Sequence, residues 1–203
     1  TALLTFDTTN TDNKASFVKF AIRMSKSVYT REAEIQSMLD SDFNRVIYLG
    51  SGGFVGLARE AQLKILELTA GKVTTAFDSS MGFRHGPKSF VNEKSLVFVF
   101  VSNDAYTRSY DLDIISELTA DQIASLVLPI QVEQAEQMAE NGFNFTESMM
   151  LVPDAYLVLP YIVFGKTVAL LSAIKTGNQP DTPSPTGTVN RVVKGVTIHA
   201  LNS

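Results

Sequence analysis

Residues 45–69 read RVIYLGSGGFVGLAREAQLKILELT, and this stretch decides the fold class. Residues 45–49 are a short apolar run of the kind that forms a buried strand. The glycine turn at 50–53 follows, and the apolar side chains of residues 54–69 then recur at helical spacing. A strand that leads through a glycine turn into a helix is the first half of a βαβ unit. The stretch therefore predicts a parallel sheet.

The rest of the chain repeats this alternation of strands and helices. Residues 96–101 (LVFVFV) are apolar throughout, which is typical of a strand covered on both faces. The other expected strands lie at 73–77 and 126–132, and further helices are expected over 31–39 and 104–118. An earlier helix is predicted by an apolar stripe at helical spacing, made of Phe17, Phe20, Ala21, Met24 and Val28. We therefore expect an α/β three-layer sandwich with a parallel sheet.

Residues 154–175 are the most apolar stretch of the chain. Pro160, Gly165 and Lys166 interrupt it, and no uncharged run reaches the roughly 18 residues that a membrane span needs. A helix that is apolar nearly all round is more often buried in a core or a subunit interface. We expect a buried helix that also contributes to a dimer.

A proline-rich segment at 176–187 follows this helix and predicts an extended linker. We therefore divide the chain into two parts. Residues 1–175 form the folded domain, including an N-terminal linker and helix. Residues 176–203 form a proline-rich C-terminal arm.

Composition excludes several classes of function. The 203 residues include 17 Lys and Arg against 21 Asp and Glu, a net charge of −4, so no basic surplus favours nucleic acid as a partner. Cysteine is absent and only His85 and His199 are histidines, so we expect neither disulfides nor a metal site. No signal peptide opens the chain, which predicts a cytoplasmic protein that does not bind membranes.

The glycine turn has two interpretations. Glycines between a strand and a helix let the backbone approach a phosphate at the helix N-terminus. The dinucleotide fingerprint G-x-G-x-x-G is incomplete here, because Val55 stands at its last glycine position and Gly56 comes one residue late. A tight strand-to-helix turn is therefore favoured over a nucleotide site.

Two further segments contain residues suited to acid–base chemistry. Glu60, Lys64 and Glu67 lie at spacings of four and three and share one face of the expected helix. They could form an ordinary surface ion-pair ladder, or a cleft in which the carboxylates transfer protons. His85 lies in the sequence Phe-Arg-His-Gly-Pro, and its imidazole suits proton transfer near neutral pH.

Together these segments resemble the sugar isomerase (SIS) family of phosphosugar-binding domains. The resemblance is carried by residues 60–67 (EAQLKILE), 83–87 (FRHGP) and 192–197 (VVKGVT). It is closest to the C-terminal SIS domain of the tagatose-6-phosphate ketose/aldose isomerase group, which includes galactosamine-6-phosphate deaminase/isomerases. The isomerase half of glucosamine-6-phosphate synthase contains related motifs. The resemblance implies a flavodoxin-like sheet, and it covers nearly the whole chain.

The resemblance also implies roles for individual residues. Glu67 matches the base that moves a proton between C1 and C2 of the open sugar, and His85 matches the residue that assists ring opening in a neighbouring subunit. Lys194, on an arm expected to pack over the active site, matches a lysine that meets the sugar carbonyl. Glu60 and Lys64 match supporting residues, and no cofactor is implied. We expect the substrate to be bound by Ser51, Gly52 and Arg84.

One departure from the family pattern affects the expected function. A sugar phosphate is held in related domains by a loop of the S-x-S-G-x-T kind, whereas residues 102–107 here read SNDAYT and Asp104 would repel a phosphate. We therefore expect a catalytic half whose upstream SIS domain binds the phosphate. The expected activity is isomerisation or deaminating isomerisation of a hexosamine 6-phosphate. A glucosamine-6-phosphate synthase domain and a non-catalytic sugar-phosphate sensor are the alternatives.

Overall fold

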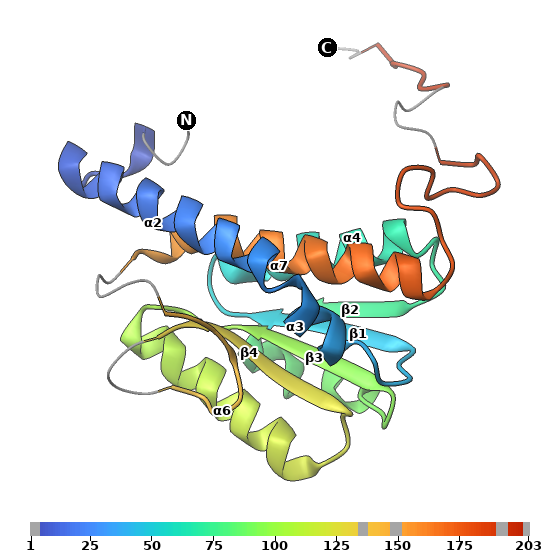
Figure 1. Ribbon diagram of the computed structural model, residues 1–203, viewed down its shortest axis with the longest axis horizontal. Helices are drawn as coiled ribbons and strands as arrows, with labels where there is room; N and C mark the ends of the chain where they lie inside the picture. Colours follow the sequence, from blue (N-terminus) through green and yellow to red (C-terminus); the bar gives the residue numbers. More distant parts are fainter. Residues whose placement is uncertain (1–4, 134–137, 147–151, 190–194, 201–203) are drawn as a thin grey trace.

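The computed structural model describes residues 5–133, 138–146, 152–189 and 195–200 (Figure 1). Within these residues all strands are parallel and form one five-stranded sheet in the order β2-β1-β3-β4-β5. The strands are β1 (Arg45–Gly50), β2 (Thr74–Asp78), β3 (Ser95–Phe100), β4 (Leu126–Val132) and β5 (Phe143–Phe145). This is the flavodoxin-like order, so the predicted fold class is confirmed.

Helices cover both faces of the sheet and make three layers (Figure 1). One face is covered by α2 (Thr11–Thr30), α3 (Glu32–Met38), α4 (Phe54–Leu68) and α7 (Asp154–Lys175). The opposite face is covered by α6 (Ala105–Asp121), together with the short α5 (Ser80–Phe83) and the 3-10 turn η1 (Pro87–Phe90). The side chain of Asp104 caps α6 by accepting a hydrogen bond from the backbone N–H of Thr107 at 2.9 Å.

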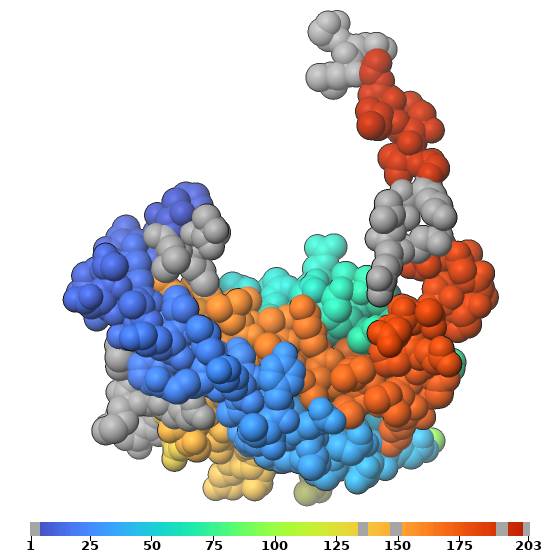
Figure 2. Space-filling model, turned by 45° about the horizontal axis from the view of Figure 1, so that its top comes forward, coloured from blue at the N-terminus to red at the C-terminus, as the bar shows by residue number. Residues whose placement is uncertain are grey.

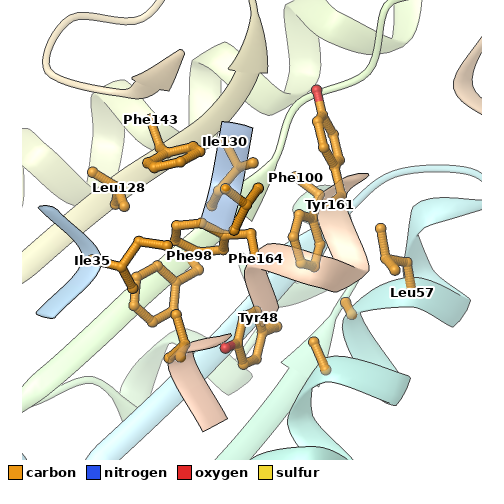
Figure 3. Packing of buried hydrophobic residues seen from close by; sticks show 14 of the residues in the cluster. Ile35, Tyr48, Leu57, Phe98, Phe100, Leu128, Ile130, Phe143, Tyr161 and Phe164 are labelled. Carbon is orange, nitrogen blue, oxygen red and sulfur yellow. The ribbon is translucent and has the colours of Figure 1, made fainter. Parts of the chain in front are cut away.

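The alternation of side chains along β3 explains its continuous apolar run. Phe98 and Phe100 face α7 and contact aromatic residues of the larger core, as Figure 3 shows. Phe98 meets Phe164 edge to face, and Phe100 stacks on Tyr161. Val97 and Val99 point the other way, into a second core beneath α6. Successive side chains of a strand point to opposite faces, so a strand buried on both faces must be apolar at every position.

The apolar helix α7 lies between α2 and α4 (Figure 1). It is long and apolar enough to cross a membrane, yet 61% of its most apolar window is buried within the fold. Gly165 allows close approach to α4, because a Cβ there would lie 3.0 Å from the Cβ of Ala61. The prediction of a buried core helix is confirmed.

Sequence patterns missed three short elements and misjudged one segment. α5, η1 and β5 have only three or four residues each, too few to establish a periodicity. The segment 176–187 is turned rather than extended: the N–H of Thr182 donates to the Gln179 carbonyl, and that of Gly187 donates to the Ser184 carbonyl. Asn178 ties the segment to α4 by donating to the Leu68 carbonyl at 2.7 Å.

Candidate functional site

The structure brings Glu60, Lys64 and Glu67 together on α4. The Lys64 ammonium lies 2.7 Å from Glu67 Oε2 and 3.6 Å from Glu60 Oε1. Both carboxylate side chains are 46% exposed, whereas that of Lys64 is 25% exposed. The hydrogen bond to Glu67 is the main reason why the pKa of Lys64 is raised. We call this group the α4 ladder. Its carboxylates are held by one cation and remain accessible from outside the domain.

His85 lies on the other side of the sheet from the α4 ladder. α4 packs on one face through Leu57 and Ile65, which belong to the larger core. His85 follows α5, whose Phe83 is buried in the core beneath α6. The sheet therefore separates His85 from Glu67 of the same chain.

The turn that holds His85 is fixed by its backbone and by α6. The N–H of His85 donates to the Gly82 carbonyl at 3.1 Å, and Gly86 has a φ of 151°, which favours glycine. The Arg84 guanidinium binds the Glu117 carboxylate at 2.5 Å. Arg84, predicted to bind substrate, is thus engaged by an acidic partner within the chain.

The glycine turn is a tight connection between β1 and α4. A Cβ on Gly50 would lie 2.7 Å from the Cβ of Phe54, and Gly52 has a φ of +56°. Ser51, predicted to bind substrate with Gly52, donates its hydroxyl to Asp111 Oδ1 at 2.6 Å. Local geometry alone therefore accounts for the glycines at positions 50 and 52.

A buried polar network occupies the carboxyl edge of the sheet, between the loops that follow β1 and β3. Asp111 is fully buried. Besides the hydroxyl of Ser51, it accepts the hydroxyl of Ser80 at 2.5 Å and the backbone N–H of Ser102 at 3.0 Å. Burial raises the pKa of Asp111, and these hydrogen bonds oppose the rise. We call Asp111 and its three serine partners the Asp111 network.

A second carboxylate extends this arrangement. Asp154, in the first turn of α7, accepts from the Ser102 hydroxyl at 2.5 Å and from the Asn103 N–H at 2.7 Å. Open α/β sheets bind ligands at this edge, where the strand order reverses. Here the carboxylates of Asp111 and Asp154 already accept hydrogen bonds from the loop after β3. Neither aspartate was identified from the sequence, since single aspartates far apart in the chain give no local signal.

Lys194 lies outside the described residues, so its predicted role is not tested. Residues 195–200 are exposed and stand away from the body of the domain (Figure 2). The packing of the arm over the active site therefore stays a prediction. Among the residues that the structure describes, no group of three or more His, Asp or Glu side chains could hold a metal ion.

Known proteins resemble this chain over most of its length. The D-galactosamine-6-phosphate deaminase AgaS of Escherichia coli is 47% identical over 157 residues, which are 77% of this chain and 41% of the relative. The crystal structure of tagatose-6-phosphate ketose/aldose isomerase from Escherichia coli matches with a TM-score of 0.76 and 35% identity. That match covers 91% of this chain and 47% of the other. The chain belongs to the SIS family.

Other comparisons define the limits of this assignment. AgaS of a Shewanella strain is 42% identical over 179 residues, covering 88% of this SIS domain and 44% of the relative. The C-terminal domain of glucosamine-fructose-6-phosphate aminotransferase from Francisella tularensis has a TM-score of 0.64 at 18% identity, over 83% of this chain and 44% of the other. A match at that identity shows the fold alone. No protein-family model matches the chain. The SIS domain spans less than half the length of these curated relatives.

Proposed function

We propose that this SIS domain supplies the catalytic groups of an enzyme that isomerises a hexosamine 6-phosphate, with or without deamination. Conversion of galactosamine 6-phosphate to tagatose 6-phosphate is the reaction type we favour. The α4 ladder supports this proposal most strongly, because it offers two accessible carboxylates around one ammonium in a domain related to a galactosamine-6-phosphate deaminase.

The proposed chemistry is a proton transfer between adjacent carbons. In the open-chain sugar, Glu67 removes the proton from C2, and the electrons of that bond form the C1=C2 double bond of an enolamine. The C1 carbonyl electrons move to O1, which gains the proton that the nitrogen loses when the imine forms. Glu67 then returns the proton to C1, which leaves an imine at C2. Water adds to the imine and releases ammonia, so that a ketose 6-phosphate remains. One carboxylate serves both proton steps because the two carbons are neighbours.

Lys64 and Glu60 support this step in the proposal. The Lys64 ammonium donates to Glu67 and holds it in one orientation. As a cation it also favours the negative charge that develops on the sugar oxygen during proton removal. Lys194 is proposed to meet the sugar carbonyl from the arm. The proposed proton transfers use side chains alone, so the proposal includes no cofactor or metal.

The ring-opening group is proposed to come from a second chain. His85 would protonate the ring oxygen of a sugar bound beside the α4 ladder of its neighbour, because the sheet separates the two residues within one chain. The proposed assembly is therefore a homodimer or a larger homo-oligomer. We place it in the cytoplasm and propose no nucleic-acid or membrane partner.

The phosphate is proposed to bind to another part of the protein. Asp111 and Asp154 take the polar groups of the loop after β3, and their charges disfavour an added anion there. The curated relatives are more than twice as long as the matched region. An upstream SIS domain is the proposed phosphate-binding partner.

The test uses the full-length enzyme with galactosamine 6-phosphate and glucosamine 6-phosphate in parallel, and it assays both ketose and ammonia. We expect Glu67→Gln to lower turnover at least about a thousandfold while the sugar phosphate still binds. Glu93→Gln, a loop carboxylate, is the matched control. Turnover by Glu67→Gln would overturn the assignment of the base. Binding of the sugar phosphate without turnover in the wild type would instead identify a sensor.

A further inference from the structure

Helix α6 contacts the segment around His85 at three levels. Near the carboxyl edge of the sheet, Asp111 accepts the hydroxyl of Ser80 at 2.5 Å. One to two turns further along, Ile114 and Leu118 share a buried cluster with Phe83. These contacts fix α5, which leads directly into the turn with His85.

The third contact involves residues on either side of the histidine in the chain. One carboxylate, that of Glu117, binds the residue before His85 and the residue three positions after it. Its Oε2 accepts from Arg84 Nε at 2.6 Å, and its Oε1 accepts from Lys88 Nζ at 2.6 Å. Bonds between charged groups are about twice as strong as neutral ones, and two of them on one acceptor define an orientation.

We call Glu117 with Arg84 and Lys88 the Glu117 clamp. Its side chains are only partly exposed. The side chains of Glu117, Arg84 and Lys88 are 28%, 33% and 29% exposed. Lys88 also pairs with Asp121 at 2.8 Å, one turn further along α6. The hydrogen bonds to Lys88 and Arg84 hold the pKa of Glu117 below its usual range, so it stays charged near neutral pH. His85 itself remains exposed at the apex.

We propose that Glu117 is a positioning residue of the isomerase reaction, acting through His85. By holding Arg84 and Lys88 on α6, it fixes the short turn between them and presents the imidazole to the neighbouring chain. The inference rests on the proposed function, because it assumes that His85 assists ring opening. Without the Glu117 carboxylate, Arg84 loses this ion pair and Lys88 keeps only its pair with Asp121. The turn is then held less tightly, and a displacement of about 1 Å at a catalytic group is enough to lower the rate severely.

The test is a double-mutant cycle in the full-length enzyme, with kcat and KM measured for Glu117→Gln, His85→Ala and the double variant. We expect Glu117→Gln to lower kcat about tenfold or more and to change KM less than about threefold. If Glu117 acts through His85, the double variant is no slower than His85→Ala alone. Asp113→Asn is the matched control, since this exposed carboxylate lies one turn away on the same helix. We expect it to retain wild-type kcat.

Each outcome of the cycle has a defined meaning. An unchanged kcat in Glu117→Gln, or effects of the two single variants that multiply in the double variant, would overturn the positioning role. Full turnover by His85→Ala would overturn the proposed function of the histidine instead. Glu117→Asp keeps the charge on a shorter side chain, so partial recovery of kcat relative to Glu117→Gln is expected. No recovery, with KM raised in both variants, would indicate a substrate-binding role and contradict the proposal.

Discussion

The α4 ladder and the Asp111 network use similar residues in opposite surroundings. The ladder pairs carboxylates with an ammonium on a half-exposed helix surface. The Asp111 network places a carboxylate in the interior and surrounds it with hydroxyl and N–H donors from the segments that follow β1, β2 and β3. Exposed ion pairs contribute little to stability, whereas a buried charge must be fully hydrogen-bonded. In the proposed function the ladder supplies the chemistry, whereas the Asp111 network stabilises the fold.

The largest effect is expected for Asp111→Ala, which tests the structural side of this comparison. Removing the carboxylate leaves the hydroxyls of Ser51 and Ser80 and the N–H of Ser102 without their acceptor. We expect the free energy of unfolding to fall by about 3 to 5 kcal/mol, since each buried unpaired donor costs about 1 to 3 kcal/mol. Urea denaturation of the purified wild-type and variant chains measures this loss of unfolding free energy.

The control for this variant is Asp113→Ala on the same helix. Its side chain is exposed, so the free energy of unfolding should change by no more than about 0.5 kcal/mol. Equal losses in the two variants would mean that the Asp111 network has no special structural role.

An intermediate, pH-dependent effect is expected for Glu117→Gln, whose carboxylate is partly buried. The pKa of Glu117 is lowered from 4.5 by its bonds to Lys88 and Arg84, so its ion pairs stabilise the fold above that pH. The wild type should have a higher free energy of unfolding than the variant near neutral pH. This difference should vanish as the pH falls through the lowered pKa of Glu117, where the carboxylate takes up a proton.

Urea denaturation midpoints of both proteins at a series of pH values measure this pH dependence. A difference between wild type and Glu117→Gln that grows on acidification would reverse the sign and contradict the ion-pair assignment.

The smallest effect on stability is expected for Glu67→Gln in the α4 ladder. Glu67 is 46% exposed, so loss of its ion pair with Lys64 should change the free energy of unfolding by about 0.5 kcal/mol or less. Thermal and urea unfolding of this variant provide the measurement. A loss as large as that of Asp111→Ala would place the ladder among the structural features and erase the contrast between the two regions.

The sequence predicted the ladder more fully than the buried network for a physical reason. Glu60, Lys64 and Glu67 interact along one helix, where spacing alone sets proximity. Ser51, Ser80 and Asp111 meet only after three strands have paired, and no local pattern anticipates that. The clamp of Glu117 on the His85 turn is likewise tertiary. The parallel sheet was predictable from the strand and helix patterns of residues 45–69 and 96–101, whereas its flavodoxin-like order was expected only from the family resemblance. The three residues of β5 are too few to show a pattern.

The most direct test of the central claim, that the active site is shared between chains, mixes two inactive variants. Glu67→Gln retains His85, and His85→Ala retains Glu67, so each mixed dimer contains one intact site. Co-expression of the two full-length variants in equal amounts should restore about a quarter of wild-type turnover, because half of the dimers are then mixed. A mixture no more active than either variant alone would contradict the account.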